Sequence, residues 1–331
     1  MSMQETGPVV VLDHDFGDID IERSIMEPAG LEVVAAQCKT EDDVVAVARD
    51  AAGVLTQYAE VKERALSGLR RCRVIARYGT GVDTVDVAAA TRRGIRVTNA
   101  PNEWCADEVA DHAVALLLTL ARKLPAYDRA TRRGSWSWQD GRPIHRMRGA
   151  TLGLLSFGAI ARGIGARMAS FGARVTAHDP FLDPDEIRAA GAAPVSFDEL
   201  LERSDHVVVQ APLTPETRGL IGERELRRMK PTAILVNTAR GPIIDDDALY
   251  RALREGWIAG AGLDDIAEEP AKRRGWTPAS PLFSLDNVVV TPHAAYYSEE
   301  SLEFVRRFAA NEVVRVLSGQ EPMSPVNLKA A

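Results

Sequence analysis

Cysteine and long apolar runs are scarce in this sequence, and both shortages limit what the protein can be. Cysteine occurs only 3 times in 331 residues, at widely spaced positions. An odd number of scattered thiols cannot form a disulfide framework and suits a reducing compartment. The most apolar stretch, residues 113–121, is far shorter than the roughly 18 residues that a membrane helix needs. Residues 1–8 lack the basic and apolar regions of a secretory signal, so we expect a cytoplasmic protein without a membrane partner.

Positive charge is also in deficit. The chain carries 40 Lys and Arg against 47 Asp and Glu, a net charge of −7. This balance opposes nonspecific binding to a phosphate backbone, so we expect no nucleic-acid partner. Charged residues make up 26% and hydrophobic residues 46% of the chain, which is an ordinary globular composition. At about 150 residues per domain, the length predicts two domains.

Short apolar segments alternate with helical patterns along the chain. The pattern predicts strands at residues 9–12, 31–34, 53–55, 74–76 and 96–98, and again at 151–156, 173–178, 206–210, 233–237, 259–263 and 288–290. Helices are predicted at residues 42–51, 108–133, 162–171, 197–203, 246–255 and 299–317. Strands that alternate with helices are typical of parallel βαβ units, so the predicted fold class is α/β and doubly wound.

The loop after the predicted strand 151–156 matches part of the dinucleotide-binding pattern G-x-G-x-x-G. Ser156 stands at the first glycine position, Gly158 at the second and Ala161 at the third. Gly158 would let a pyrophosphate approach the backbone, and alanine is accepted at the third position. Asp179 ends the next strand, 21 residues after Gly158 (179 − 158). A carboxylate there accepts a hydrogen bond from the ribose 2′-hydroxyl and repels a 2′-phosphate, which predicts NAD as the cofactor.

Serine at the first position of this pattern leaves two interpretations open. The turn could be slightly wider, with the Ser156 hydroxyl near a phosphate, or cofactor binding could be weaker. Ala159 and Ile160 begin the following helix, and their amides can point at a phosphate in either case.

Ionisable residues follow three later strands, in the segments 237–241, 263–270 and 291–297. Ligands of open α/β sheets bind at the carboxyl ends of the strands. Arg240 offers a planar fork that can grip a substrate carboxylate through two hydrogen bonds. His293 is the usual kind of proton donor or acceptor near neutral pH, and a neighbouring carboxylate would favour its protonated form. Together these groups suit hydride transfer between nicotinamide and C2 of a 2-hydroxy acid.

Eight segments of the chain resemble motifs of the D-isomer-specific 2-hydroxyacid dehydrogenase family. They lie at residues 77–83, 99–101, 156–161, 212–214, 235–241, 262–264, 269–270 and 291–293. The resemblance implies a catalytic triad of Arg240, Glu269 and His293, a small 2-hydroxy or 2-oxo acid as the substrate, and a homodimer. We predict two Rossmann-like domains: a discontinuous substrate domain, residues 1–102 plus 298–331, and an NAD-binding domain, residues 103–297, inserted within it.

Further site residues follow from the resemblance. Arg77 would give the substrate carboxylate a second cation, and the backbone amides of Thr80 and Gly81 would complete a small anion-binding nest. Asp264 would contact the nicotinamide end of the cofactor. The cofactor cleft would be lined by Ala211, Pro212, Thr217 and Thr238. No metal site is predicted.

The segment 293–300 most resembles the C-terminal-binding-protein branch of this family. That branch typically has tryptophan where Tyr296 stands, and tyrosine would keep an aromatic wall in the substrate pocket. Two other functions stay open. One is an NAD(H)-sensing, oligomeric protein-binding module with vestigial catalysis, like the corepressors of this branch, and the other is a phosphoglycerate or phosphite dehydrogenase relative. The intact Arg240, Glu269 and His293 argue against vestigial catalysis.

Overall fold

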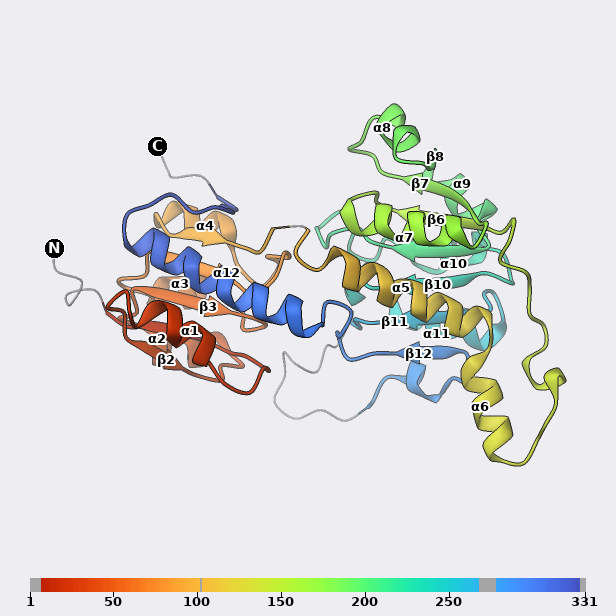
Figure 1. Ribbon diagram of the computed structural model, residues 1–331, viewed down its shortest axis with the longest axis horizontal. Helices are drawn as coiled ribbons and strands as arrows, with labels where there is room; N and C mark the ends of the chain where they lie inside the picture. The colour runs from red at the N-terminus through yellow and green to blue at the C-terminus, as the bar shows by residue number, and fades with distance from the viewer. Residues whose placement is uncertain (1–6, 102, 268–277, 328–331) are drawn as a thin grey trace. The chain divides into compact units, whose positions relative to one another are not determined.

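The computed structural model describes residues 7–101, 103–267 and 278–327, which fall into two compact units (Figure 1). Among these residues, the first unit comprises 7–104, without 102, and 298–327, and the second comprises 105–267 and 278–297. Each unit is built on one parallel sheet. In the described ranges, no helix combines the length and the apolar character that crossing a membrane requires.

The sheet of the first unit has five strands in the order β2-β1-β3-β4-β5, and all neighbours are parallel. The strands are β1 (Val9–Val11), β2 (Val33–Ala35), β3 (Gly53–Thr56), β4 (Val74–Arg77) and β5 (Arg96–Thr98). The helices are α1 (Asp20–Met26), α2 (Glu41–Ala48), α3 (Glu63–Gly68), α4 (Val87–Arg92) and α12 (Glu299–Leu317). All five predicted strands are present, and each strand end lies within two residues of its predicted position.

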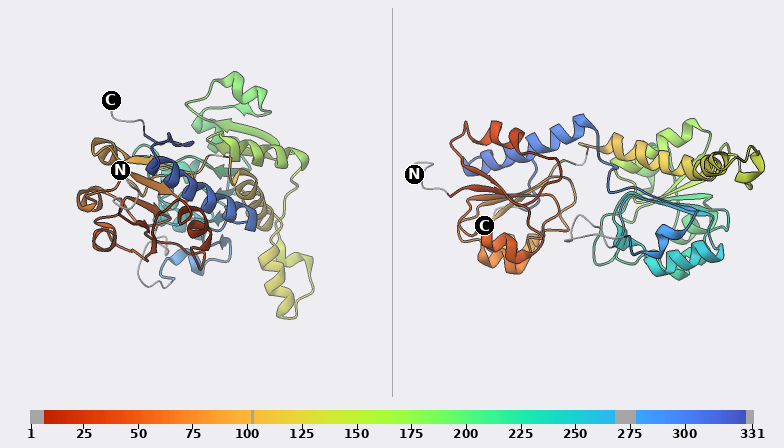
Figure 2. Two further views of the ribbon diagram at one scale, coloured as in Figure 1. Left: turned by 60° about the vertical axis from the view of Figure 1, so that its left-hand side comes forward. Right: turned by 90° about the horizontal axis from the view of Figure 1, so that it is seen from below.

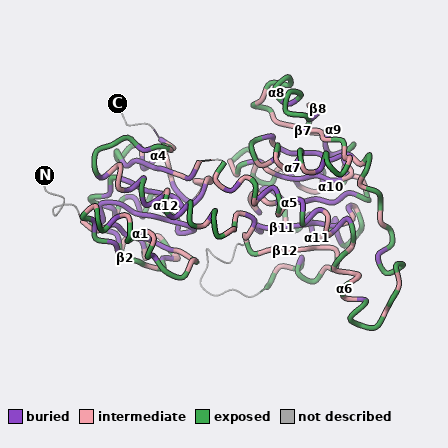
Figure 3. Tube along the Cα trace, in the orientation of Figure 1, coloured by how far each residue is buried: buried purple, intermediate pink, exposed green. Residues whose placement is uncertain are grey.

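Alternate residues of β1 belong to two separate apolar layers. Val9 and Val11 lie in the layer with α1 and α12, while Val10 and Leu12 lie in the layer with α2, α3 and α4. Successive side chains of a strand point to opposite faces of the sheet, and here helices cover both faces (Figure 2). Burial is accordingly concentrated along the strands, while outer helix faces and loops are exposed (Figure 3). This double coverage explains the unbroken apolar sequence at 9–12.

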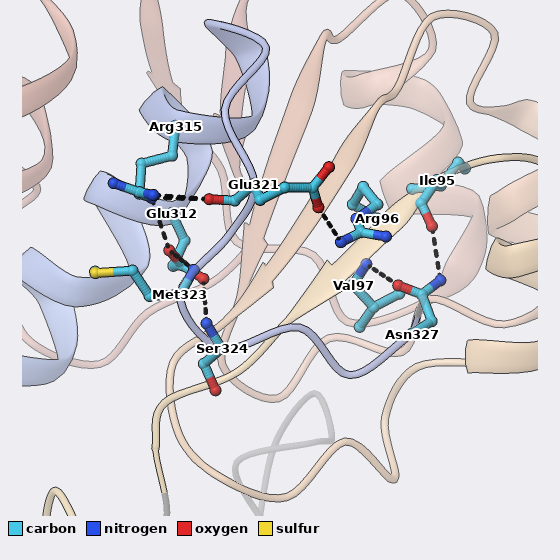
Figure 4. A network of polar contacts seen from close by, with 9 residues as sticks. All are labelled: Ile95, Arg96, Val97, Glu312, Arg315, Glu321, Met323, Ser324 and Asn327. Atoms are coloured by element: carbon cyan, nitrogen blue, oxygen red, sulfur yellow. Dashed lines mark hydrogen bonds and ion pairs between the residues drawn. The ribbon is translucent and has the colours of Figure 1, made fainter. Parts of the chain in front are cut away.

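The C-terminal segment after α12 returns to β5 and joins the first unit through polar contacts (Figure 4). The Asn327 side chain accepts a hydrogen bond from the Val97 amide at 2.8 Å. Glu321 forms an ion pair of 2.9 Å with Arg96. The fully buried Glu312 accepts hydrogen bonds from two backbone amides of the returning segment, at 2.9 and 3.0 Å. These contacts hold the end of the chain to a sheet formed by its first hundred residues.

The sheet of the second unit has seven strands in the order β12-β11-β10-β9-β6-β7-β8. They are β6 (Thr151–Leu155), β7 (Arg174–His178), β8 (Ala193–Pro194), β9 (His206–Val209), β10 (Ile234–Asn237), β11 (Gly260–Leu263) and β12 (Val288–Val290). The helices are α5 (Ala106–Ala121), α6 (Leu124–Arg132), α7 (Ala159–Ser170), α8 (Pro184–Ala189), α9 (Phe197–Arg203), α10 (Glu223–Arg228) and α11 (Asp246–Glu255). Helices α5, α7 and α8 pack in the layer on one face, and α9, α10 and α11 in the layer on the other. The prediction omitted the two-residue strand β8 and the short helices α8 and α10.

The predicted single helix over residues 108–133 is wrong. The structure divides it into α5 and α6, because Lys123 lies between them in a left-handed conformation with φ of 56°. Pro125 lies in the first turn of α6. In a continuous helix its ring would clash with the carbonyl of residue 121, and it has no N–H to donate. The proline was therefore the signal in the sequence for this break.

His206 begins β9 and is 7% exposed. Its Nδ1 atom finds no hydrogen-bond partner within the part of the chain that the structure describes. Burial lowers the pKa of His206 to about 4, and Lys230 and His145 act in the same direction, against Asp205. The unfolded chain binds this proton near pH 6.5, so stability is lost as the pH falls from about 6.5 to about 4, by at most about 3 kcal/mol.

We expect His206→Leu to remove this part of the acid sensitivity. Between about pH 7 and about pH 4.5, the variant should lose less free energy of unfolding than the parent protein, because leucine binds no proton in either state. Denaturant unfolding of both proteins at both pH values measures the difference, in which the shared titrating groups cancel. Equal losses in the two proteins would show that His206 is not the source.

Candidate functional site

The predicted site residues of the second unit gather at one edge of its sheet. From β12 across to β7, the strands are followed in turn by His293, Asp264, Arg240, Ala211, Gly158 and Asp179. Parallel strands end at the same edge of a sheet, and neighbouring strands lie about 4.8 Å apart. His293 and Asp179 therefore lie at opposite ends of one row of loops. This arrangement suits an extended ligand whose two ends differ chemically.

The loop after β6 leaves the start of α7 accessible. Gly158 is the N-cap residue of α7, and Gly158 and Ala159 are both exposed. A Cβ atom at residue 158 would meet no other atom within 4 Å, so nothing blocks the approach of a phosphate to this backbone. The first amides of a helix have no partner within the helix and favour anions. The amides of Ala159 and Ile160 therefore fit the pyrophosphate of a dinucleotide.

Asp179 follows β7 and is half-buried. Its carboxylate accepts hydrogen bonds from the amides of Phe157 and Phe181, at 2.9 and 3.0 Å, and from the Ser156 hydroxyl at 3.1 Å. Ser156 itself has a left-handed backbone with φ of 71°. The structure thus joins Ser156 and Asp179, two residues that the sequence predicts as separate contacts of the cofactor.

Arg240 follows β10 in a loop shaped by Asn237. The fully buried Asn237 side chain donates a hydrogen bond to the Arg240 carbonyl at 2.9 Å and accepts one from the Ala239 amide at 3.0 Å. The Arg240 side chain donates to the Ala239 carbonyl at 2.8 Å. A Cβ atom at Gly241 would lie 2.1 Å from the carbonyl carbon of Ile266, so glycine is required for this loop to pack against the loop after β11. These contacts fix the backbone that carries Arg240.

His293 follows β12 in a left-handed conformation, with φ of 54°. Such a backbone is rare outside glycine and recurs at functional sites. The His293 amide donates a hydrogen bond to the Asp264 carbonyl at 2.7 Å. Its Nδ1 atom lies 4.0 Å from a carboxylate oxygen of Asp265, and its ring meets the Tyr296 ring edge-on at 6.1 Å between centroids. The imidazole therefore has a buried carboxylate and an aromatic ring as neighbours.

Asp264 holds the turn that carries His293. It is 2% exposed, and its carboxylate accepts hydrogen bonds from the Thr291 hydroxyl at 2.6 Å and from the amides of Ala294 and Ala295 at 2.9 Å. The ring of His112, on α5, lies 2.9 Å from the same Thr291 hydroxyl. The contacts that the structure describes thus bind Asp264 to residues 291–295. Its contact with the nicotinamide end stays a prediction.

Sequence reasoning missed Asp265, His112 and Thr291. Asp265 follows Asp264 directly after a strand, and that paired acid was a signal that could have been used. His112 and Thr291 are 179 residues apart, and nothing in the sequence indicates that they meet. Burial raises the pKa of Asp246, on α11, to about 6, and neighbouring carboxylates, including Asp265, act in the same direction. Asp265 thus stands near a second carboxylate, that of Asp246, as well as near His293.

The loop after β9 contains three of the predicted cofactor-cleft residues. Ala211 is buried, and the Thr217 hydroxyl donates a hydrogen bond to the Pro212 carbonyl at 2.6 Å, which closes the loop. The Gln210 side-chain amide donates to the Thr238 hydroxyl. This bond links the loops that follow β9 and β10. The contact of these residues with the cofactor stays a prediction.

In the first unit, the predicted substrate residues lie at the end of β4 and in the loop after it. Arg77 ends this strand and is 9% exposed. A Cβ atom at Gly79 would lie 1.6 Å from the Nη1 atom of Arg77, so glycine makes room for the guanidinium. The Thr80 hydroxyl accepts a hydrogen bond from the Trp104 indole at 3.0 Å, and Gly81 follows in the same loop. Arg77, Thr80 and Gly81 thus stand together at the carboxyl edge of the first sheet.

Glu269, the third member of the predicted triad, lies outside the described residues. Its role therefore stays a prediction. Within the ranges that the structure does describe, no group of three or more His, Cys, Asp or Glu residues is arranged to hold a metal ion.

Comparison with known proteins gives consistent matches over nearly the whole chain. The profile of the family described as "D-isomer specific 2-hydroxyacid dehydrogenase, NAD binding domain" matches residues 114–295. The glyoxylate reductase of Korarchaeum cryptofilum is 39% identical over 303 residues, which are 91% of this chain and 87% of that protein. The D-3-phosphoglycerate dehydrogenase of Archaeoglobus fulgidus is 37% identical over 92% of this chain and 56% of that protein. The crystal structure of D-lactate dehydrogenase from Aquifex aeolicus, complexed with NAD and lactic acid, matches with a TM-score of 0.86 at 26% identity, covering 96% of this chain and 98% of that one.

Proposed function

The chain belongs to the D-isomer specific 2-hydroxyacid dehydrogenase family and is an NAD-dependent enzyme, and on this premise we propose that it reduces small 2-oxo acids of the glyoxylate type. The match to a glyoxylate reductase over 91% of the chain supports this substrate class. The C-terminal-binding-protein branch, predicted from residues 293–300, receives no support from the relatives named above. We therefore favour catalysis over nucleotide sensing.

The observation that carries this proposal is the placement of Arg240 and His293. They follow β10 and β12, which flank β11 in the sheet. Two strand spacings put the loops that carry them about 10 Å apart. In a 2-oxo acid, the carboxylate and the carbonyl are joined by a single bond. A cationic fork on one loop and a proton donor on the other therefore suit the two ends of one small molecule.

The reaction divides between these two side chains. Arg240 binds the substrate carboxylate through two hydrogen bonds and orients the adjacent carbonyl. A reduced nicotinamide coenzyme, when bound, would supply the hydride for C2. His293 gives its proton to the carbonyl oxygen as the C–O double bond becomes single, so that a 2-hydroxy acid forms. In oxidation, His293 takes the hydroxyl proton. The Asp265 carboxylate lies 4.0 Å from the Nδ1 atom of this ring, and Glu269 stays the predicted third member of the triad.

We assign the binding of the coenzyme to the opposite end of the row of loops. The amides of Ala159 and Ile160, at the start of α7, would hold the pyrophosphate. Asp179 would accept a hydrogen bond from a ribose hydroxyl. The two assignments place the adenosine portion near β6 and β7, away from the loops of Arg240 and His293.

Tyr296 supports a small substrate, because its ring stands beside His293. We expect Tyr296→Ala to raise kcat/KM for a bulky 2-oxo acid such as phenylpyruvate about tenfold relative to glyoxylate. About tenfold is the low end of what a single methylene group contributes to discrimination in a pocket. Steady-state NADH oxidation with both acids measures the ratio. Tyr296→Phe is the matched control and should keep the parent ratio. An unchanged ratio in the alanine variant would place Tyr296 outside the pocket.

A phosphorylated hydroxy acid is the second candidate substrate, because a D-3-phosphoglycerate dehydrogenase matches 92% of this chain. NADH oxidation with glyoxylate, hydroxypyruvate, pyruvate and phenylpyruvate, beside NAD reduction with 3-phosphoglycerate, tests the proposal. We expect the highest kcat/KM with glyoxylate or hydroxypyruvate. A higher value with 3-phosphoglycerate would replace the proposed substrate class.

We further propose a homodimer. The segment after α6 carries Trp136 and Trp138, whose exposed fractions are 91% and 67%. Large exposed indoles are typical of interaction surfaces. Sedimentation equilibrium should give twice the mass of one chain, and a single-chain mass would contradict the dimer.

A further inference from the structure

We propose that Ser156 is a positioning residue for Asp179, and that its hydroxyl thereby sets the preference for NADH over NADPH. This inference rests on the proposed role of Asp179 as the acceptor of a ribose hydroxyl. Its starting point is the hydrogen bond of 3.1 Å that the Ser156 hydroxyl donates to Oδ2 of Asp179.

The Asp179 carboxylate is held by three donors. Oδ2 accepts from the Ser156 hydroxyl and from the Phe157 amide at 2.9 Å, while Oδ1 accepts from the Phe181 amide at 3.0 Å. A carboxylate offers about four acceptor positions, so these bonds leave one, on Oδ1. The Ser156 amide also donates to the His178 carbonyl at 2.8 Å, which ties the ends of β6 and β7 together. The carboxylate is therefore fixed in orientation before any ligand binds.

The backbone of Ser156 gives an independent reason to look for a role of its side chain. Its φ of 71° lies in the left-handed region, which glycine adopts without strain and other residues rarely do. Glycine is the usual residue at this position of the dinucleotide-binding pattern. A serine at this position has a strained backbone. Its side chain, however, makes a hydrogen bond to Asp179 that glycine cannot make. A strained residue with a specific contact indicates a functional constraint.

The direction of this bond distinguishes the two interpretations that the sequence leaves open. A serine hydroxyl has one proton, and phosphate oxygens can only accept. The proton of Ser156 is already given to Asp179. The hydroxyl therefore does not donate to the pyrophosphate while this bond persists, and its influence on the coenzyme passes through Asp179.

The two coenzymes differ at the group that Asp179 would meet. NADH presents a 2′-hydroxyl, which can donate to the remaining acceptor position on Oδ1. NADPH presents a 2′-phosphate, which the carboxylate repels. A carboxylate whose orientation is fixed maintains both the attraction for NADH and the repulsion of NADPH. If the Ser156 hydroxyl is removed, the carboxylate gains freedom to turn away, so the attraction for NADH and the repulsion of NADPH should both decrease.

The test compares the binding of NADH and NADPH to Ser156→Ala and Ser156→Gly by calorimetry or protein fluorescence. We expect the Kd for NADH to rise about 3- to 10-fold in both variants, the value of one hydrogen bond, with the Kd for NADPH unchanged or lower. Both variants lack the hydroxyl, but only glycine relieves the backbone strain. Their Kd values should therefore agree, while Ser156→Gly should have the higher Tm.

Three results would overturn the proposal. Equal weakening of NADH and NADPH would mean that the hydroxyl contacts a part common to both coenzymes. An unchanged Kd for NADH would mean that the bond to Asp179 has no influence on binding, and parent-like binding in Ser156→Gly alone would assign the effect to the backbone. Asp179→Asn separates this inference from its premise. If Asp179→Asn loses NADH affinity while Ser156→Ala does not, only the role of Ser156 is wrong, and if Asp179→Asn binds both coenzymes like the parent, the role of Asp179 is wrong as well.

Discussion

We expect His293→Asn to lower kcat for 2-oxo acid reduction by about 10²- to 10⁴-fold, the range in which a positioned acid or base contributes to catalysis. Asparagine tolerates the left-handed backbone that residue 293 adopts, with φ of 54°. The backbone amide of residue 293 can also keep its hydrogen bond to the Asp264 carbonyl. The substitution therefore removes the proton donor while it preserves the turn.

Two controls accompany the His293 variant. NADH binding should stay at the parent level, because Asp179 and the start of α7 lie at the other end of the row of loops. His145→Asn is the matched histidine control, since His145 belongs to the same unit but precedes β6 and so lies away from the carboxyl ends of the strands. It should keep the parent kcat. A His293→Asn enzyme within tenfold of the parent kcat would remove His293 from proton transfer.

The second large effect concerns Arg240. We expect Arg240→Gln to lower kcat/KM for glyoxylate by about 10²- to 10³-fold, because it removes a charged partner that binds the substrate carboxylate through two bonds. Arg240→Lys keeps the charge without the planar fork and should lose less. If Arg240 binds the substrate carboxylate equally well in the ground state and in the transition state, most of the loss in kcat/KM should appear as a higher KM. If this contact is stronger in the transition state, most of the loss should appear as a lower kcat.

The control for Arg240 is an arginine on the surface of the same unit. Arg251, on α11, is exposed and pairs with Glu223 at 2.8 Å. Arg251→Gln should leave kcat/KM for glyoxylate unchanged. The same kinetic constants for Arg240→Gln and the parent enzyme would exclude the proposed carboxylate contact.

The strands and their order along the chain could be predicted from the sequence, because burial on both faces of a sheet leaves unbroken apolar segments such as 9–12 and 207–209. The break between α5 and α6 was also present in the sequence, as Pro125. The apolar pattern continues across the break and by itself predicts one helix. Local backbone chemistry decided the structure at this point.

Contacts between distant residues could not be predicted in the same way. The sequence predicts Asp264 at the cofactor, but it does not indicate that this carboxylate also holds the 291–295 turn. His112 reaches Thr291 from a separate helix. For Ser156, the sequence allows a hydroxyl near phosphate, whereas the structure directs it to Asp179. Residue type limits what a side chain can do, but the direction in which it points is set by packing.

The most direct test of the central claim follows a labelled hydride. Hydroxypyruvate is reduced with NADH that carries deuterium in its transferable position at C4 of nicotinamide, and the glycerate formed is analysed by mass spectrometry and for its configuration. The proposed reaction predicts D-glycerate with one deuterium at C2, formed by the parent enzyme at a rate that Arg240→Gln and His293→Asn strongly reduce. Glycerate of the L configuration, glycerate without deuterium, or no product while NADH still binds would contradict it.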